Sequence, residues 1–430
     1  MSNIKWCAIQ PLTGGMYLGA EEAIGHPAEF ILSFPGLGDV TKTNKETGEV
    51  ISAGNEYSLM KYLEKKNRRP DYRVFNRGMF DGIDDLDPEI LESQWSLSNK
   101  PLDYSNMDLC IALPVCSGLS NSSTSNLDSR MQKNNNMIWI SKYALYKIKP
   151  QIYIFENAPT FMGNRGNYVR KILEDIAKDA GYSIVYYKTD SKWHHNCQRR
   201  PRTFIIFYKQ DDMNNIKTPE FEFEHEGTTM DKYFELIPKD ATQQIVLNML
   251  PINKTYIAFY TKKFGSNYHD IVKSFSGYMI DNDLYDELCE FTNNEMDFDN
   301  KTKQTVCKFF NHVRDKVSQG KGFYGFISFK PIGNLSSAIM FRTMQSQLHW
   351  KEDRLLTIRE NLWLMGMPHD FELQGNVFGE YAKIGQNVPV KTAKFIISQA
   401  IKNINNNTNN KLVRYFNNDL MTEVEYKLIA

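Results

Sequence analysis

The chain has 430 residues, 41% of them apolar and 13% aromatic, so it is long enough for two or three domains with real hydrophobic cores. Lys plus Arg and Asp plus Glu are equal at 51 each, which excludes a global basic field, so any nucleic-acid-binding surface would have to be local. The six cysteines form no C-x-x-C pair, which argues against a zinc site and a secreted disulfide framework. No apolar run reaches the length of a membrane span, and we expect a cytoplasmic monomer without membrane contact.

Strands and helices alternate over the first two hundred residues. The predicted strands, in chain order, lie at 4–9, 30–34, 50–53, 109–113, 151–155, 183–187 and 203–208. The predicted helices follow the glycine-rich turn at 11–19 and lie at 57–65, 137–148 and 167–180. This alternation predicts an α/β fold with a mostly parallel sheet and helices on both faces.

The sequence changes character from about residue 211. Weak periodicity and the Gly-aromatic stretch 320–330 predict a separate, smaller and irregular domain; this stretch suits either nucleic-acid binding or an ordinary β core. The α/β character returns after Arg354 with helices at 359–365 and 391–404, and the asparagine-rich run 403–410 predicts a solvated connector. We therefore expect a catalytic domain at 1–210, a second domain at 211–350, a return to the first at 351–404 and a tail at 405–430.

Three polar motifs stand next to predicted strands. Cys116 follows the strand at 109–113, Glu156 follows the strand at 151–155, and Arg200 and Arg202 precede the strand at 203–208. In a parallel sheet these motifs can converge on one edge, where open α/β folds place their ligands. By itself Cys116 is best explained as a small buried side chain, and the other two motifs give it a chemical role.

A thiolate, a carboxylic acid and arginines suit one reaction together. Carbon 5 of cytosine is too weak a nucleophile to take a methyl group from a sulfonium, but addition of a thiolate to carbon 6 makes the ring enamine-like. A carboxyl group that protonates or hydrogen-bonds ring nitrogen 3 stabilises the resulting charge, and arginines can hold both the base and the carboxyl group. A base then removes the carbon 5 proton, and the thiolate leaves.

With these residues in place, the sequence resembles the DNA (cytosine-5) methyltransferase family over most of the chain outside the middle segment. Seven stretches match the family's motifs in the family's order. They are Gly14–Glu22 (glycine-rich motif), Val50–Glu56 (ribose-binding strand end), Pro114–Ser120 (Pro-Cys loop), Glu156-Asn157, Gln198–Arg202, Arg354–Glu360 with Gly366–Phe371, and Tyr381–Pro389 (closing motif). The resemblance implies a seven-stranded methyltransferase-type sheet, with residues 211–350 as the target-recognition region.

The resemblance also implies a cofactor, a partner and residue roles. The cofactor would be S-adenosylmethionine and the partner double-stranded DNA, with the target cytosine flipped out of the duplex. Cys116 would be the nucleophile, Glu156 the acid at ring nitrogen 3, and Arg200 and Arg202 supporting arginines. The implied cofactor contacts are Gly14, Gly15, Gly19, Glu56 on the ribose, Asp81 on the adenine amino group, Pro114 and Gln386. The implied substrate contacts are Ser117, Ser120, Arg130, Asn157 and Gln198.

Several positions depart from the family pattern. The usual Phe and first Gly of the cofactor motif are replaced around Pro11 and Leu12, and Gln386 stands where Asn is usual. Val115 replaces a common second proline, and Ser117 replaces a glutamine. The changes leave the nucleophile, acid and arginines intact, but they predict a reshaped donor pocket and allow a variant methyl donor.

Two rival functions remain from the sequence. A minority of the family acts on transfer RNA, although the large middle segment favours DNA. A catalytically silent DNA-binding member is the other rival, and the joint presence of Cys116, Glu156, Arg200 and Arg202 speaks against it. His194-His195-x-Cys197 lacks a second ligand cluster and is better explained as a loop than as a metal site.

Overall fold

A ten-stranded sheet forms the centre of the molecule in the computed structural model, which describes residues 4–35, 42–43, 50–51, 56–119, 127–211, 227–246, 248–272, 274–320, 335–339, 348–349, 351–374, 383–402, 415–417 and 422–427. The strand order is β13-β14-β9-β11-β8-β7-β1-β2-β5-β6. The strands are β1 (Trp6–Ile9), β2 (Phe30–Ser33), β5 (Asp71–Phe75), β6 (Ile90–Glu92), β7 (Leu109–Ala112), β8 (Ile152–Asn157), β9 (Tyr182–Asp190), β11 (Pro201–Lys209), β13 (Tyr415–Asn417) and β14 (Thr422–Lys427).

Seven neighbouring strands, from β9 to β5, form the predicted mostly parallel sheet, but β5 takes the place of the strand predicted at 50–53, which pairs outside this sheet. β8, β7, β1, β2 and β5 pair in parallel. β11 runs antiparallel to both β8 and β9, so β9 points in the same direction as the five parallel strands. The predicted α/β fold with a mostly parallel sheet is therefore confirmed.

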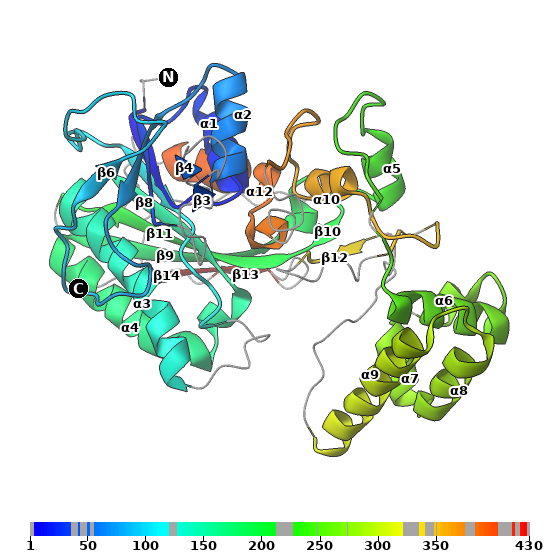
Figure 1. Cartoon of the computed structure of the whole chain (residues 1–430). Helices are drawn as coiled ribbons and strands as arrows, with labels where there is room; N and C mark the ends of the chain where they lie inside the picture. Colours follow the sequence, from blue (N-terminus) through cyan, green and yellow to red (C-terminus); the bar gives the residue numbers. More distant parts are fainter. Residues whose placement is uncertain are drawn as a thin grey trace.

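The sheet buries a hydrophobic core on each face because its strands are apolar on both sides. In β1, Trp6 and Ala8 belong to one core, whereas Cys7 and Ile9 belong to the other. Helices α1 (Gly15–Ile24), α2 (Tyr57–Lys65) and α12 (Val390–Lys402) cover the first face (Figure 1). Helices α3 (Leu127–Tyr143) and α4 (Asn167–Ala180) cover the second. The expected helix at 137–148 begins earlier, at Leu127, and its last turn, at Ala144–Ile148, is a π-helix.

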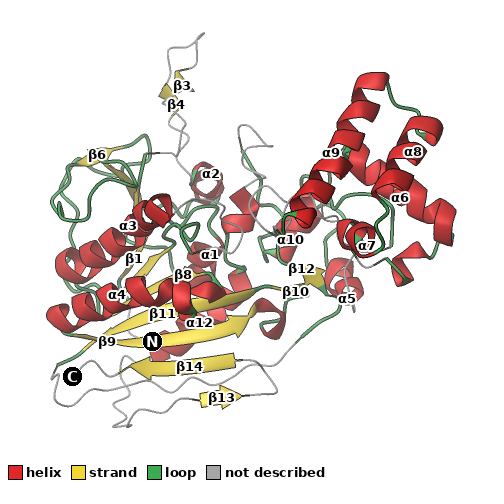
Figure 2. Ribbon diagram, turned by 90° about the horizontal axis from the view of Figure 1, so that it is seen from below, coloured by secondary structure: helices red, strands yellow, loops and turns green. Residues whose placement is uncertain are grey.

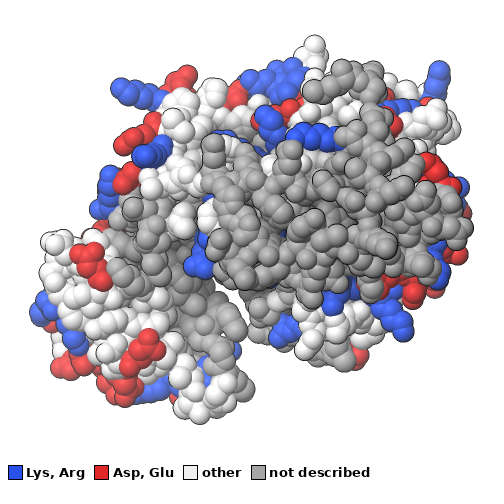
Figure 3. Space-filling model, turned by 180° about the vertical axis from the view of Figure 1, so that it is seen from behind, with Lys and Arg blue, Asp and Glu red and all other residues white. Residues whose placement is uncertain are grey.

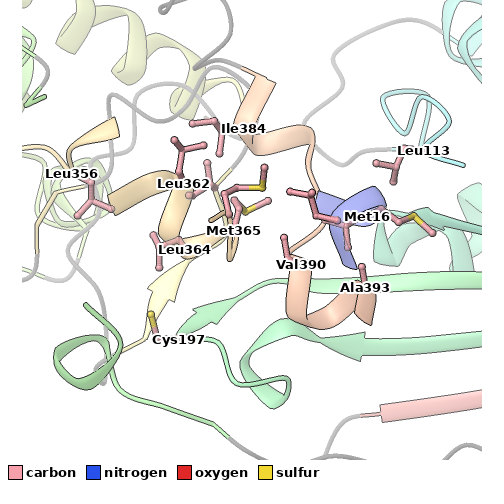
Figure 4. Packing of buried hydrophobic residues seen from close by; sticks show 14 of the residues in the cluster. Met16, Leu113, Cys197, Leu356, Leu362, Leu364, Met365, Ile384, Val390 and Ala393 are labelled. Atoms are coloured by element: carbon pink, nitrogen blue, oxygen red, sulfur yellow. The ribbon is translucent and has the colours of Figure 1, made fainter. Parts of the chain in front are cut away.

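Helices α1 and α12 pack closely because α1 carries glycine at the contact. A Cβ atom on Gly15 would lie 2.0 Å from the carbonyl oxygen of Val388, and one on Gly19 would lie 2.6 Å from the Cβ of Ala393. Figure 4 shows Met16 of α1 close to Val390 and Ala393 of α12. The closing motif is therefore fixed against the start of the chain.

A group of helices stands beside the sheet (Figure 2). It contains α6 (Pro251–Phe264), α7 (Phe275–Asp281), α8 (Tyr285–Glu295) and α9 (Asn300–Ser318), and it follows the short helix α5 (Met230–Glu235). Lys262 and Lys263 of α6 form ion pairs with Glu295 and Glu287 of α8. This part of the predicted second domain is more regular than its sequence indicated, because its buried aromatic residues follow helical spacing over short helices.

Three further short elements complete the description. β10 (Gln198–Arg199) pairs with β12 (Ser336–Ser337), which joins the Gln-x-Arg-x-Arg motif to the returning end of the middle segment. β3 (Lys42–Thr43) pairs with β4 (Val50–Ile51) away from the main sheet, and α10 (Ile358–Leu364) matches the predicted helix. The Gly-aromatic stretch beyond Gly320 lies outside the described residues. Within the described part of the chain, no helix is long and apolar enough to cross a membrane.

The predicted tail contributes to the sheet. β14 pairs antiparallel with the outer side of β9, and β13 pairs with β14. The segment is short and polar, so its sequence gave little sign of strand pairing, whereas the edge of a long neighbouring strand offers it a full row of backbone hydrogen bonds.

Candidate active site

Cys116 lies just beyond the carboxyl end of β7, as the sequence predicted. Its thiol is free, and the residue is partly exposed. The loop that carries it is held at both ends: the Val115 N–H donates to Asn136 Oδ1 (2.9 Å), and the Leu119 N–H donates to the carbonyl oxygen of Cys116 (3.1 Å). Thr160 then donates to the carbonyl oxygen of Leu119 (2.5 Å), which ties this loop to the segment after β8.

Glu156 lies at the end of β8, the strand next to β7, and is buried. Arg202 forms an ion pair with it, with Nε 2.6 Å from Oε1. Because β11 runs antiparallel to β8, with Phe204 opposite Glu156, the start of β11 lies at the end of β8. Because of this reversal, Arg202, the second residue of β11, lies beside the end of β8 and reaches Glu156.

The charges of these groups act on one another. Burial raises the pKa of the Cys116 thiol, the carboxylate of Glu156 raises it further, and the guanidinium groups of Arg202 and Arg200 lower it. Burial also raises the pKa of Glu156, against the opposing effect of both arginines. The thiol, carboxyl group and two cations therefore share one electrostatic environment at the carboxyl edge of the sheet.

Arg200, the other predicted supporting arginine, makes its hydrogen bonds to backbone carbonyl groups. Its side chain is 2% exposed and donates to the carbonyl oxygens of Ile339, Gly385 and Asn387. Burial, with the like charge of Arg202, lowers the pKa of Arg200 to about 9. Arg200 thus ties the middle segment and the closing motif to the catalytic sheet, while Arg202 pairs with the acid, and a supporting role of Arg200 in the chemistry stays a prediction.

Two predicted substrate contacts are likewise turned toward the protein. Gln198 is buried and donates through Nε2 to the carbonyl oxygen of Leu364 (3.3 Å) at the end of α10. Asn157 is buried, and its Oδ1 accepts from the Ala158 N–H (2.9 Å), which shapes the turn after β8. Both amides bond to the chain in this structure, and their contact with a substrate stays a prediction.

The three predicted cofactor glycines have packing roles. Gly14 has φ +101°, and a Cβ atom there would lie 2.5 Å from Leu59 Cδ1 of α2. The Gly15 N–H donates to Asn387 Oδ1 (2.7 Å), and Gly19 contacts α12. Their lack of side chains is therefore explained by helix packing, and their contact with a cofactor stays a prediction.

Glu56, predicted to bind a ribose, is fully buried just before α2. Its carboxylate accepts from Ser33 Oγ (2.5 Å), the Tyr72 hydroxyl (3.0 Å) and the Leu12 N–H (3.3 Å). Burial raises its pKa, and the three hydrogen bonds oppose that rise. In this conformation Glu56 joins β2, β5 and the loop after β1, and its contact with a ribose stays a prediction.

Asp81, predicted to bind the adenine amino group, is exposed and caps its own turn. Its Oδ2 accepts from the Gly78 N–H (2.6 Å). Gln386 lies in the segment Ile384–Gln386, which Arg200 holds through the carbonyl oxygen of Gly385. Pro114 is buried between β7 and Cys116. Ser117 is partly exposed in the loop after Cys116. Ser120 and the side chain of Arg130 lie outside the described part of the structure, although helix α3 already includes Arg130, which we expected in a loop.

Two buried asparagines that position the site were not predicted from the sequence. Asn136 holds Val115 beside the nucleophile, and Asn387 holds both Gly15 and, through its carbonyl oxygen, Arg200. For Asn136, the sign that could have been used is a polar residue on an otherwise apolar helix face. For Asn387, it is the position next to Gln386. Both signals are weak in a chain this rich in asparagine.

The strand order, with a free cysteine and an arginine-paired glutamate at adjacent strand ends, defines a methyltransferase-type α/β protein. The family model for C-5 cytosine-specific DNA methylases matches residues 86–402. The chain therefore belongs to this family.

Named relatives match this chain at low identity. Type II methyltransferase M.HgiBI of Herpetosiphon aurantiacus is 21% identical over 213 residues, which are 49% of this chain and 47% of that protein. Type II methylase M.HgiEI of the same organism is 33% identical over 86 residues, or 20% of each chain. The chain thus spans about half the length of the first relative and a fifth of the second. Among solved structures, methyltransferase EhMeth of Entamoeba histolytica has a TM-score of 0.49 and 12% identity, over 94% of this chain and 98% of that one.

Proposed function

We propose that this protein transfers a methyl group from S-adenosylmethionine to carbon 5 of a cytosine flipped out of double-stranded DNA, through a transient covalent bond to Cys116. The observation that carries the proposal is the position of Cys116 and the Glu156–Arg202 pair at the ends of adjacent strands, within one electrostatic environment. A thiol without an acid and a cation beside it would not suit this chemistry.

Each of the three side chains has a definite task. The sulfur of Cys116 adds to carbon 6 as the thiolate, and it leaves after carbon 5 has been methylated and has lost its proton. Glu156 donates a hydrogen bond or proton to ring nitrogen 3, and its raised pKa favours the protonated form that can donate. Arg202 orients the carboxyl group and can reach the oxygen of the base.

The carboxyl edge of β1 fits the methyl donor, which supplies an electrophilic methyl group on a sulfonium when bound. Helix α1 begins there after Gly14 with no acidic residue in its first turn, and the buried Gln10 beside it has a side-chain oxygen without a partner among the described residues. Gly14, Glu56 and Gln386 would hold the donor by resemblance. The family match, which names cytosine-specific DNA methylases, supports this donor as well.

DNA is the substrate that the comparisons favour over transfer RNA. The matching family is described by its action on DNA, and the two Herpetosiphon relatives are named as Type II enzymes. Figure 3 shows basic and acidic side chains interspersed over the described part of one face, so DNA contact would depend on local groups. We assign target recognition to residues 211–350, whose returning end pairs with β10 beside the active site.

The test uses the full chain with labelled S-adenosylmethionine. We expect label in unmethylated duplex DNA and not in transfer RNA, and a denaturation-resistant adduct with DNA that contains 5-fluorocytosine, whose fluorine cannot be removed as a proton. Cys116→Ala is the control for both readouts. Label in transfer RNA alone would establish the RNA-directed rival, and label in neither substrate from folded protein would establish a silent binder.

Bisulfite sequencing of DNA from cells that express the protein gives the recognised site. We expect protected cytosines in one short sequence context, and none with Cys116→Ala. Protection that persists in the variant would rule out Cys116 as the nucleophile.

A further inference from the structure

Gln10 is a buried amide at the carboxyl end of β1. It directly follows Ile9, has φ +51°, and donates its backbone N–H to the carbonyl oxygen of Leu32 (2.7 Å). Its side chain is 1% exposed. Nε2 lies 3.7 Å from the sulfur of Met79, and Oε1 has no hydrogen-bond partner among the described residues.

This arrangement is costly for a residue with a packing role alone. A sulfur atom is a weak acceptor, and a buried carbonyl oxygen without a donor loses the hydrogen bond that it makes to water in the unfolded chain. Its neighbours Leu32 and Met79 are apolar and buried, so leucine or methionine would fill the same space without that loss. The amide therefore indicates a donor and an acceptor that the described residues do not supply.

The position of Gln10 indicates which ligand part supplies them. The chain runs from β1 through β2 to β5 on one side, and continues through β7 and β8 on the other side of β1. Open α/β sheets bind ligands outside the strand ends at such a reversal. Two residues beyond Gln10, the Leu12 N–H donates to Glu56, the predicted ribose carboxylate. A base attached to that ribose would lie close to Gln10.

Asp81, the residue first expected to bind the adenine amino group, is poorly placed for it. The carboxylate is exposed, and Oδ2 is already engaged by the N–H of Gly78 in the same turn. That turn also carries Met79, whose flexible side chain covers the Gln10 amide and can be displaced without moving a strand.

We propose that the Gln10 carboxamide recognises the adenine base of the methyl donor. This inference rests on the proposed function, because it concerns the donor of that reaction. Oε1 accepts from the exocyclic amino group, and Nε2 gives up its contact with Met79 to donate to the adjacent ring nitrogen. A glutamine side chain pairs with adenine in this two-bond manner in protein–DNA complexes.

The test compares two ligands by titration calorimetry. S-adenosylhomocysteine carries the amino group, whereas S-inosylhomocysteine carries a carbonyl oxygen in its place. We expect the unmodified protein to prefer the adenosyl ligand by about 10-fold to 100-fold. In Gln10→Leu the ratio should fall toward one, mainly through weaker binding of the adenosyl ligand, and Gln10→Met provides a second variant should leucine disturb the fold.

Gln151→Leu, at an exposed glutamine just before β8, is the matched control and should keep the preference of the unmodified protein. Asp81→Asn tests the competing residue. A preference that survives both Gln10 variants, or that disappears in Asp81→Asn instead, would overturn the assignment to Gln10. Equal binding of both ligands by the unmodified protein would overturn it as well, while leaving the proposed cofactor intact. Failure to bind either ligand would count against the cofactor itself.

Discussion

Arg200 and Arg202 are two residues apart in one motif, but they belong to regions with different physical tasks. Arg202 lies at the active edge, which we define as Cys116, Glu156 and Arg202, where groups are partly exposed or shift one another's pKa. Arg200 lies in the seam, defined as Gly15, Gly19, Gln198, Arg200 and Asn387, where close contacts and hydrogen bonds join distant segments.

The comparison teaches that a family motif combines residues for chemistry with residues for assembly. At the active edge, polar side-chain atoms are available to a ligand, or to a neighbouring group whose own charge can change. In the seam, most polar groups form hydrogen bonds with carbonyl oxygens and amides of the chain itself. Substitutions should therefore separate the two regions: changes at the active edge should reduce the rate of methyl transfer, whereas changes in the seam should reduce the free energy of unfolding.

The largest effect is expected for Cys116→Ser at the active edge. A hydroxyl at this position is a far poorer nucleophile than a thiolate, so single-turnover methyl transfer should fall on the order of 10⁴-fold or more. Thermal unfolding should hardly change, because the residue is partly exposed and its loop is held by backbone contacts. If this variant keeps a tenth of the activity, Cys116 is not the nucleophile.

Arg200→Met and Arg202→Met contrast the two regions directly. Loss of Arg200 leaves the carbonyl oxygens of Ile339, Gly385 and Asn387 without their donor, so the free energy of unfolding should drop by about 3 kcal/mol. Loss of Arg202 should cost less than half of that, because Glu156 can take up a proton, but it should slow methyl transfer by about 100-fold. Denaturant unfolding and single-turnover rates measure the two effects.

Equal unfolding losses in these two variants would contradict the division into active edge and seam. Arg200→Lys serves as the control, since a single ammonium group can satisfy part of the three carbonyl oxygens and should recover part of the stability.

Gly15→Ala tests the seam with a single methyl group. The new Cβ would meet the carbonyl oxygen of Val388, and α1 and α12 would have to separate, so the free energy of unfolding should fall by about 2 kcal/mol. Gly82→Ala is the matched control: it meets open space and should be close to neutral. Similar melting temperatures for both variants would show that the close approach of the helices is unimportant.

The smallest effect concerns the titration of Cys116. Its raised pKa predicts that alkylation by iodoacetamide, corrected with Cys116→Ser, keeps rising with pH beyond the range of an ordinary cysteine. Glu156→Gln removes a negative charge and should move the profile to lower pH. Arg202→Met removes a positive charge and should move it to higher pH, with Arg200 still present in both variants. A profile that Glu156→Gln moves upward would place the carboxylate outside the environment of the thiol.

Much of the fold could be predicted because the apolar pattern of a segment in the sequence agrees with the burial of that segment in the structure. The helix at 167–180 has one apolar face and a glycine directly after it, and it occurs at the predicted residues. The strands that are buried on both faces also appear where continuous apolar runs predicted them. The tail strands and the helices of the middle segment were missed, because the tail depends on pairing with β9 and the helices on contacts among short elements.

The candidate site was predictable in its chemistry and less so in its geometry. Cys116 and Glu156 follow strands whose direction is dictated by the parallel sheet, so their approach could be foreseen. The different roles of Arg200 and Arg202 could not be foreseen, because both precede the same predicted strand at 203–208. Only the folded positions of Ile339 and Asn387 distinguish them. Asp81 and Glu56 were assigned by resemblance, but sequence could not show that other donors already occupy their carboxylates.

The pairing of β14 with β9 has a consequence for how the protein behaves in solution. β9 is nine residues long, and without β14 its outer backbone groups would face water as a template for a strand of another molecule. A chain shortened before residue 415 should therefore self-associate at concentrations where the full chain stays dispersed, a difference that light scattering would detect. β13 and β14 therefore protect the edge of the sheet from pairing with strands of other molecules.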